Sequence, residues 1–207
     1  MHHLITTKGC GSAIVEAALT LSGLPYRIEE LDYEKPGLER DRLRSLNPLG
    51  QVPTLLLPDG SLMTESAAMI LHIADLRPAA GLAPPADDPA RPAFLRWLVF
   101  LVAAIYPTFT YGDDTNRWVP GEEAGAVLKA TTNQRREDMW RYLESQVEPA
   151  PWLLGRGFSA VDLYISVMTH WRPRRPWFAE HCPKLTRVAL RVDAKPQLAE
   201  VWQRNFG

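Results

Sequence analysis

The stretch 47–66 constrains the fold of this chain more than any other segment, because turn and strand signals alternate through it. Asn-Pro and Leu-Gly pairs open it with a loop. Val52 precedes Pro53 and is therefore pushed toward an extended conformation. The next residues, 54–57, form an apolar run of strand length. The sequence thus predicts a loop that leads directly into a buried strand.

A hairpin and a helix are predicted in the same stretch. Asp59-Gly60 is a strong signal for a two-residue turn, so a second short strand is expected to pair with the first. Thr64 is then placed to act as the N-cap of a long apolar helix over about 65–76. This one stretch therefore specifies a strand, a turn, a second strand and the start of a helix.

The residues before this stretch predict a strand, a helix and another strand. Residues 4–6 suit a strand, and 26–31 alternate between apolar and polar side chains. Residues 12–22 are small and apolar at helical spacing, with Gly23 as a C-terminal stop. Residues 34–45 predict a loop and a short irregular helix. The resulting order, β-α-β-α-β-β-α, implies a mixed sheet that is parallel in its first unit and antiparallel at the hairpin.

A linker and an all-helical region are predicted for the rest of the chain. Four prolines lie within residues 77–90, so we place one domain at 1–78, a linker at 79–90 and a second domain at 91–207. Strand signals disappear beyond the linker. Helices are expected at about 90–111, 122–147, 159–171, 185–193 and 196–204.

Composition and charge exclude several classes of protein. Of 207 residues, 46% are hydrophobic, which is enough for a sizeable core. The net charge of −1 favours neither nucleic acid nor an anionic membrane, although a local basic excess in 171–195 leaves an anionic partner as a weaker alternative. The longest apolar runs fall far short of the about 18 residues that a membrane span needs.

Cysteine usage and the N-terminus indicate where the protein works. The two cysteines, Cys10 and Cys182, fit a reducing compartment rather than a disulfide framework. No basic region followed by an apolar segment opens the chain, so no signal peptide is visible. His181-Cys182 has no further ligands at metal spacing. We therefore expect a cytoplasmic protein without a metal, and with no nucleic-acid or membrane partner.

The stretch 47–66 resembles the glutathione-binding segment of the glutathione transferase family, in its bacterial, cytosolic type. The matching pattern is Asn-Pro-x-Gly-x-Val-Pro, then Asp-Gly, then Glu-Ser at a helix start. A second match is the Ser159-Ala160-Val161-Asp162 capping box, preceded by Gly157 and Phe158. The resemblance implies an α/β thioredoxin-like N-terminal domain followed by an all-α C-terminal domain. It also implies a homodimer.

The resemblance also implies which residues hold glutathione. Val52 would present its backbone to the cysteinyl part of the peptide like an added strand, which requires a cis peptide bond to Pro53. Gln51 would make a further contact. Glu65 would pair with the ammonium group, and Ser66 with the amides of the helix start would bind a carboxylate. Without the resemblance, these last two residues indicate only ordinary helix capping.

Members of this family lower the pKa of the glutathione thiol, because the thiolate is the nucleophile. A hydroxyl or thiol at the end of the first strand normally does this. A gap-free match places Gly9 or Gly11 at that position, so Cys10 comes into register only with a one-residue change in loop length. Cys10 is our leading catalytic candidate, Ser12 the second and Thr7 the third, whereas packing in the turn explains Cys10 and N-capping explains Ser12 without any catalytic role.

Aromatic residues near the end of the first long helix are candidates for an acceptor pocket between the domains. They are Tyr106, Phe109, Tyr111 and Trp118, and packing in the core would explain them equally well. The sequence predicts an enzyme in which bound glutathione thiolate attacks a small hydrophobic electrophile, or in which thiols exchange through Cys10. The alternative is a non-catalytic glutathione-binding or regulatory module that acts through protein partners.

Overall fold

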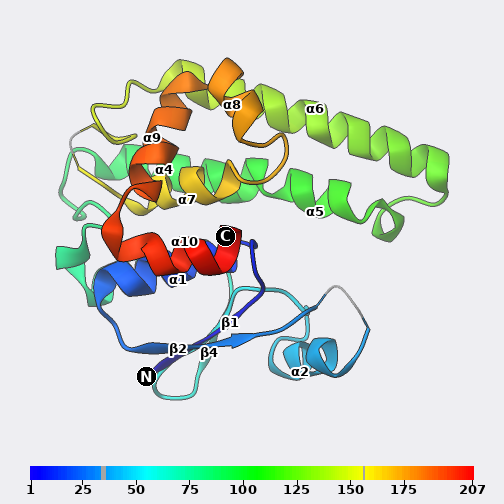
Figure 1. Ribbon diagram of the computed structural model, residues 1–207, viewed down its shortest axis with the longest axis horizontal. Coiled ribbons are helices and arrows are strands. Elements are labelled where there is room, and N and C mark those ends of the chain that lie inside the picture. Colours follow the sequence, from blue (N-terminus) through cyan, green and yellow to red (C-terminus); the bar gives the residue numbers. More distant parts are fainter. Residues whose placement is uncertain (34–35, 156) are drawn as a thin grey trace.

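The computed structural model describes residues 1–33, 36–155 and 157–207, so residues 34 and 35 of the predicted loop lie outside the described ranges. A four-stranded sheet with three helices forms the first part of the chain, and helices form the rest (Figure 1). The order β-α-β-α-β-β-α agrees with the prediction. The strands are β1 (His2–Thr6), β2 (Tyr26–Glu30), β3 (Thr54–Leu56) and β4 (Leu62–Met63), and the helices are α1 (Ser12–Ser22), α2 (Leu38–Leu46) and α3 (Ser66–Leu76).

The sheet has the strand order β2-β1-β3-β4 and is mixed, as predicted. β1 runs parallel to β2 and antiparallel to β3, with Ile5 opposite Thr54. Alternate residues of β1 enter different clusters: Leu4 belongs to the large core that includes α1 and α3, whereas Ile5 packs with Leu43 of α2. Because both faces of β1 are covered, all its residues are buried.

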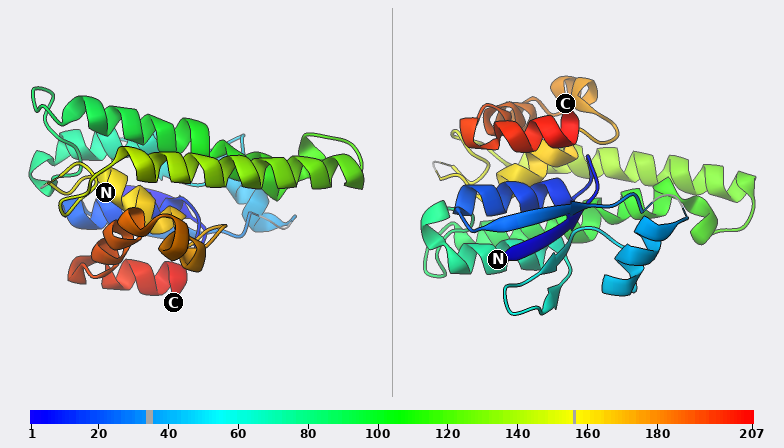
Figure 2. Two further views of the ribbon diagram at one scale, coloured as in Figure 1. Left: turned by 90° about the horizontal axis from the view of Figure 1, so that it is seen from above. Right: turned by 60° about the horizontal axis from the view of Figure 1, so that its bottom comes forward.

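The second part of the chain is built around α7 (Ala160–Met168), which is buried along its whole length. The other helices are α4 (Arg91–Phe100), α5 (Pro107–Asp113), α6 (Glu122–Gln146), α8 (Arg175–His181), α9 (Pro183–Asp193) and α10 (Ala199–Phe206). Seen from above, the α4–α5 run and α6 lie side by side (Figure 2). The sequence missed α8, because two prolines and three arginines in residues 172–176 conceal its helical spacing.

The predicted capping box opens α7. Asp162 accepts hydrogen bonds from the backbone N–H of Ser159 at 2.8 Å and of Leu153 at 2.9 Å. Burial raises the pKa of this carboxyl group to about 6, against the opposing effect of these hydrogen bonds. The box therefore fixes both the start of α7 and the incoming loop.

The predicted linker is better packed than its proline content suggests. Residues 78–80 form a 3₁₀ turn, and Leu82 is buried and accepts a hydrogen bond from the Ala160 N–H at 2.7 Å. One continuous core extends from the sheet into the helical part. The domain boundaries at residues 78 and 91 stay a prediction.

The helical run Arg91–Asp113 is long and apolar enough to cross a membrane by length and composition, contrary to the sequence-based expectation. It is the one such helix among the described residues. Its apolar side chains include Phe94, Leu98 and Leu101, which are buried in the protein core. The run also packs against α6 and α7, so helix packing accounts for the buried part of its apolar surface, which is 39% of the apolar window.

Candidate functional site

Cys10 lies in the loop that joins β1 to α1. Its Sγ is 3.6 Å from the hydroxyl of Tyr33, and the side chain is half-buried. α1 begins two residues later without a side-chain cap and without an acidic residue in its first turn. The positive end of the helix dipole is therefore not neutralised by capping side chains, which favours a thiolate in this loop.

The two hydroxyl candidates in the loop serve its structure. Ser12 is fully buried; its hydroxyl accepts a hydrogen bond from Thr6 at 2.6 Å and donates to the carbonyl of Thr7 at 3.1 Å. The Thr7 hydroxyl donates to the carbonyl of Leu31. Because each proton is already donated to a carbonyl, the geometry favours Cys10 over Ser12 and Thr7.

Side chains of the helical part hold the Gly9 peptide from both sides. Trp171 donates its indole N–H to the Gly9 carbonyl at 2.6 Å, and the Gly9 N–H donates to the Asn205 side chain at 3.3 Å. The φ of Gly9 is +68°, a left-handed conformation that glycine adopts at little cost. The residue directly before Cys10 is thus fixed by two segments distant in sequence.

Asn205 also connects this loop to a buried carboxylate. It lies in α10, which runs along α1 (Figure 1), and donates to Glu16 of α1 at 3.0 Å. The other carboxylate oxygen of Glu16 pairs with Arg204 at 2.9 Å. Burial raises the pKa of Glu16, and the contacts to Asn205 and Arg204 oppose that rise. α10 is therefore bound to α1 by polar contacts directly behind the loop.

The backbone at Val52 lies beside this loop. Ile5 is opposite Thr54 in the antiparallel β1–β3 pair, so continuing the register places Val52 at the level of Thr7. The Val52–Pro53 peptide bond is cis, as expected from the family resemblance. Within the described residues, the N–H and C=O of Val52 make no hydrogen bond. The backbone here suits pairing with an extended peptide.

Gln51 presents its side chain to solvent while its carbonyl points inward. That carbonyl accepts hydrogen bonds from Thr54 at 2.8 Å and from Asn47 at 3.1 Å, and the Gln51 side chain is exposed. These contacts fix the bend before β3. The Gln51 side chain is thereby left on the outer side, where a bound peptide could reach it.

Glu65, not Thr64, occupies the N-cap position of α3, which corrects the prediction. The chain leaves the hairpin through a left-handed conformation at Glu65, with φ of +64°, so the helix begins one residue later than predicted. A non-glycine residue in this conformation stores strain, which is typical of functional sites. α3 has no side-chain cap and no acidic residue in its first turn. Its first amides therefore suit a carboxylate ligand.

Tyr164 is a residue of this region that the sequence reasoning missed. It is fully buried in α7, and its hydroxyl is 2.7 Å from that of Ser66 at the start of α3. Burial raises its pKa, and Tyr106 and Glu65 are among its electrostatic neighbours. Tyr164 therefore connects the two sides of the site. Its one sequence signal is its position two residues after the capping-box aspartate.

The structure divides the predicted acceptor residues into two clusters. Tyr106 and Phe109 each make an edge contact with Trp171, with ring centroids 5.3 Å apart, and so lie at the Cys10 loop. Tyr111 and Trp118 pack against each other at 4.7 Å and are 42% and 46% exposed. The first pair lies beside the reactive loop, and the second forms a separate exposed pair.

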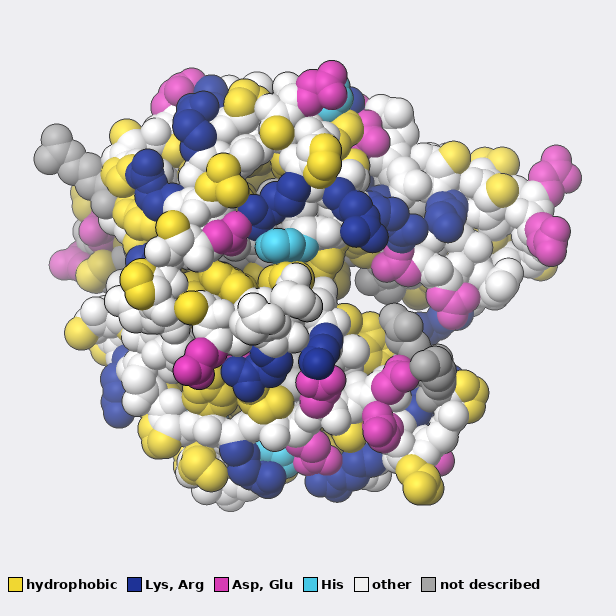
Figure 3. Space-filling view, viewed as in Figure 1, with side chains coloured by type: hydrophobic (Ala, Val, Ile, Leu, Met, Phe, Trp, Pro, Cys, Tyr) yellow, Lys and Arg dark blue, Asp and Glu magenta, His cyan; other side chains and the backbone are white. Residues whose placement is uncertain are grey.

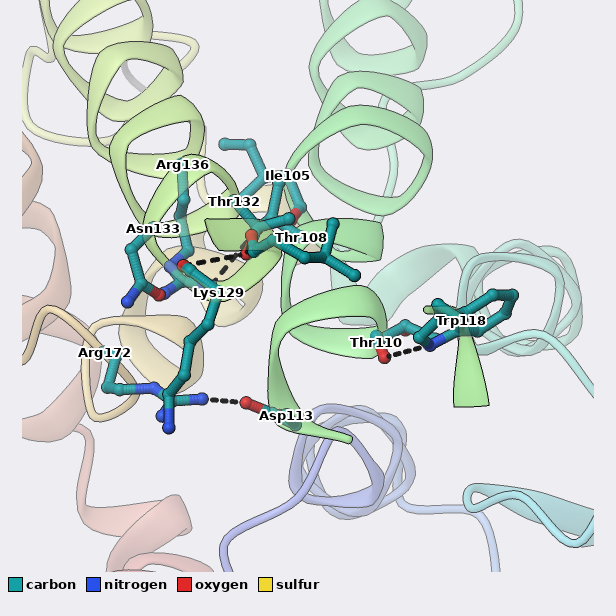
Figure 4. A network of polar contacts seen from close by, with 11 residues as sticks. Ile105, Thr108, Thr110, Asp113, Trp118, Lys129, Thr132, Asn133, Arg136 and Arg172 are labelled. Atoms are coloured by element: carbon teal, nitrogen blue, oxygen red, sulfur yellow. Dashed lines mark hydrogen bonds and ion pairs between the residues drawn. The ribbon is translucent and has the colours of Figure 1, made fainter. Parts of the chain in front are cut away.

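Polar contacts hold α5 in place behind the first cluster (Figure 4). Arg136 of α6 is buried, donates to the Thr108 hydroxyl at 3.3 Å and places its guanidinium 4.1 Å from the centre of the Phe109 ring. Burial lowers its pKa to about 10, so it remains a cation at neutral pH. Arg172 pairs with Asp113 at the other end of α5. These contacts fix the helix that carries Tyr106 and Phe109.

Neither of two surface hollows is lined by Cys10. One, of about 310 Å³, opens between α10 and the end of α9 on the face drawn in Figure 3, where basic side chains gather beside it. In it His170 stacks on Phe206 at 3.9 Å, and burial lowers the pKa of His170 to about 4. The other, of about 520 Å³, is lined by residues 119–131. Over the described ranges, no group of three or more His, Cys, Asp or Glu side chains is placed to hold a metal ion.

Comparisons with known proteins identify the family. Residues 12–76 match the model of the glutathione S-transferase N-terminal domain. The chain is 39% identical over 198 residues to the uncharacterized GST-like protein YncG of Escherichia coli, covering 95% of each chain, and 30% identical over 171 residues to glutathione S-transferase GstA of Escherichia coli O157:H7, covering 81% of each.

A solved structure shows the same arrangement. The crystal structure of a glutathione transferase homologue from Sulfitobacter with bound glutathione superimposes with a TM-score of 0.86 at 26% identity, over 98% of this chain and 97% of that one. The fold predicted from the sequence, a thioredoxin-like domain followed by a helical region, is thereby confirmed. From the sequence relatives and this likeness together, the chain belongs to the glutathione S-transferase family.

Proposed function

We propose that this protein is a glutathione transferase in which the thiolate of bound glutathione attacks a small hydrophobic electrophile, with Cys10 at the reacting sulfur. The observation that carries the proposal is the position of the half-buried Cys10 thiol, in the loop at the start of α1. Continuing the β1–β3 register places the backbone of Val52 beside this loop. Similarity to a solved relative that holds glutathione supports the ligand.

The residues of the hairpin and α3 fit the glutathione backbone. The N–H and C=O of Val52 pair with the cysteinyl unit, and Gln51 adds a side-chain contact from the outer side of the bend. The Glu65 carboxylate pairs with the ammonium group. The uncapped amides of α3, with the hydroxyl of Ser66, bind the carboxylate next to it. The peptide then lies extended, with its sulfur toward the Cys10 loop.

The conjugation step follows from this arrangement. The sulfur lone pair forms a bond to the electrophilic carbon, and the leaving group departs with the electrons of the broken bond. Tyr106, Phe109 and Trp171 supply an apolar aromatic wall for the electrophile. Tyr111 and Trp118 form a separate exposed pair and are not part of this proposed wall. We also propose that the protein is cytoplasmic and forms a homodimer.

The Cys10 thiol additionally suits exchange with a glutathione mixed disulfide. Its thiolate would attack the glutathione sulfur, form a Cys10–glutathione disulfide and release the substrate as a thiolate. A second glutathione thiolate would then attack that disulfide, giving oxidised glutathione and restoring the Cys10 thiolate. Each step forms one S–S bond and breaks one.

Retention on immobilised glutathione, followed by turnover assays, tests the proposal. One assay uses an aryl chloride as a generic electrophile, and the other uses a glutathione mixed disulfide. Cys10→Ser is expected to abolish disulfide exchange and to slow conjugation by about tenfold, which corresponds to about one pKa unit of thiolate stabilisation. Cys182→Ser is the matched control, because Cys182 is buried and its pKa is raised to about 12.

Three outcomes separate the alternatives. Retention with turnover of either substrate supports the enzyme. Retention without any turnover favours the non-catalytic binding module. Equal activity in Cys10→Ser and Cys182→Ser removes Cys10 from the site, because only one of the two thiols lies in the loop.

A further inference from the structure

Tyr164 and Ser66 share one hydrogen bond between the helical part of the chain and the first part. Tyr164 lies in α7 and Ser66 begins α3, so the contact joins residues 98 positions apart. Their hydroxyl oxygens are 2.7 Å apart. Each hydroxyl carries one proton, and a single hydrogen bond between them uses only one of the two. The direction of the second proton therefore depends on which hydroxyl donates.

Burial determines the direction of this hydrogen bond. Tyr164 is fully buried, and among the described residues Ser66 is the one hydrogen-bond partner of its hydroxyl. If Ser66 donated, the phenol proton would be buried without an acceptor, at the full desolvation cost of that group. Ser66 is half-buried, so its own proton can reach a ligand or water. Tyr164 therefore donates, and the oxygen of Ser66 accepts.

The surroundings of Tyr164 keep the phenol protonated. Burial raises its pKa above the usual value of 10, and the hydrogen bond to Ser66 opposes this rise with a smaller effect. The electrostatic effects of Tyr106 and Glu65 add to the rise. At neutral pH the Tyr164 hydroxyl is therefore always able to donate.

Packing holds the two hydroxyls together. Every residue of α7 is buried, and the capping box of Ser159 and Asp162 fixes the start of this helix. α1 packs against both α3 and α7, and α7 also packs against α4 and α9. The position of the Tyr164 hydroxyl relative to Ser66 is thus set by the shared contact of their helices with α1.

The proton of Ser66 is left for a ligand. A hydroxyl that accepts a hydrogen bond on its oxygen donates along a different direction, so this proton points away from Tyr164. Accepting a hydrogen bond also polarises the serine hydroxyl and makes it a stronger donor. Ser66 is the first residue of α3, whose first amides have no side-chain cap. In the proposed function, these amides and the Ser66 hydroxyl bind the glutathione carboxylate.

We propose that Tyr164 is a positioning residue for glutathione: by donating to Ser66, it directs the serine proton to the carboxylate that lies on the start of α3. This inference rests on the proposed function and adds to it a residue that does not touch the ligand. It makes glutathione binding by the first part of the chain depend on the packing of α7. The ligand group that the contact serves is the carboxylate beside the ammonium, not the thiol.

The direct test is Tyr164→Phe, which removes one oxygen atom and keeps the ring. We expect the dissociation constant of glutathione, measured by calorimetry, to rise about fivefold, the effect of one ordinary hydrogen bond. The kcat at saturating glutathione should stay unchanged, because no contact near Cys10 is removed. Thermal unfolding of the variant reports any loss of stability separately.

A second ligand separates a positioning role from a structural one. The peptide γ-aminobutyryl-cysteinyl-glycine keeps the ammonium group and the thiol of glutathione and lacks the carboxylate beside the ammonium. Wild type should bind it more weakly than glutathione. Tyr164→Phe should bind it as tightly as wild type does, because the group that Ser66 meets is absent. A site that is damaged in general would instead lose affinity for both peptides by the same factor.

Ser66→Ala completes a double-mutant cycle. This substitution removes the carboxylate contact itself, so the affinity for glutathione should fall by about tenfold, as expected for a hydrogen bond to a charged group. In the Ser66→Ala background, Tyr164→Phe should leave the affinity unchanged, because there is no serine hydroxyl for the tyrosine to orient.

Tyr26→Phe is the matched control. The Tyr26 hydroxyl is also 2.7 Å from an aliphatic hydroxyl, that of Thr20, and burial also raises its pKa. Tyr26 lies opposite His2, at the end of the β1–β2 pair away from the Cys10 loop. The control variant should bind both peptides as wild type does.

Three results contradict the inference while the proposed function stands. They are an unchanged affinity for glutathione in Tyr164→Phe, equal losses for the two peptides, and a full additional loss from Tyr164→Phe in the Ser66→Ala background. If the wild-type protein binds no glutathione, the proposed function fails and the inference fails with it.

Discussion

The two sides of the candidate site are built in different ways. The side that would hold the peptide, from Val52 to Ser66, comes from one continuous stretch with two turns, and its contacts are mostly between near neighbours. The side that would hold the sulfur takes its backbone from the β1–α1 loop. Its supports, Tyr106, Trp171 and Asn205, come from three other segments.

This difference suggests a division of roles. The peptide side takes its proposed ligand contacts from one hairpin and one helix start, so it should determine affinity for glutathione. The sulfur side exists only when α7 and α10 have packed against α1 and Tyr106 has reached Gly11, so it should determine the reactivity of the thiol. Substitutions on the two sides should therefore separate KM from kcat.

The largest expected effect is on the peptide side, with Glu65→Gln. It keeps the shape of the side chain and removes the charge that would pair with the glutathione ammonium. We expect the KM for glutathione to rise about 30-fold, or about 2 kcal/mol, with kcat nearly unchanged at saturation. Steady-state kinetics measure both constants. Asp75→Asn, an exposed acid on the same helix, is the control. A fall in kcat with an unchanged KM would contradict the proposed division of roles between the two sides of the site.

Asn205→Ala should produce the opposite pattern on the sulfur side. It removes the acceptor of the Gly9 N–H and one donor to buried Glu16. We expect kcat to fall about tenfold, or about 1.4 kcal/mol, because the loop that carries Cys10 is no longer fixed. The affinity for glutathione, measured by calorimetry, should stay the same.

Gln203→Ala provides the comparison for Asn205→Ala, since Gln203 is exposed on the same helix. Thermal unfolding of both variants shows how much of any change is due to general destabilisation of α10. Equal losses of kcat in the two variants would show that Asn205 has no specific part in positioning the loop.

The smallest expected effect concerns pH and the docking of α10. His170 stacks on Phe206 and faces Arg175 and Asp193. The pKa of His170 in the folded protein is about 4, below the usual 6.5. Between pH 4 and 6.5 the His170 ring is therefore protonated in the unfolded chain but neutral in the folded protein. Stability should therefore fall as the pH falls from about 6.5 to 4. Allowing for solvent screening, we expect a loss of about 1 kcal/mol.

Urea unfolding of wild type and His170→Gln at pH 7 and pH 4.5 measures this contribution. The variant lacks the titrating ring. Its free energy of unfolding should therefore fall by about 1 kcal/mol less than that of the wild type between pH 7 and pH 4.5. An equal loss in both proteins would show that protonation of His170 has no part in the acid sensitivity of α10.

Much of the fold follows from local signals in the sequence. Alternation and turn residues gave the strands, and α1 has the predicted bounds of Ser12 and Ser22. Local signals failed where a short segment depends on its surroundings. Thr64 has the chemistry of an N-cap, but the left-handed backbone at Glu65 moves the helix start. The sequence predicted one helix over about 90–111 and did not predict the π-turn Leu101–Ile105 before Tyr106.

The sequence by itself determined the strand-turn-strand-helix unit that would hold glutathione, because hydrogen bonds between residues a few positions apart are encoded by the residues themselves. Only the tertiary structure decided what surrounds Cys10. The partners of Gly9 lie 162 and 196 positions away, and Tyr106 reaches Gly11 from a separate helix. Contacts of that kind form only when the hydrophobic core brings distant helices together, so no pattern of neighbouring residues specifies them.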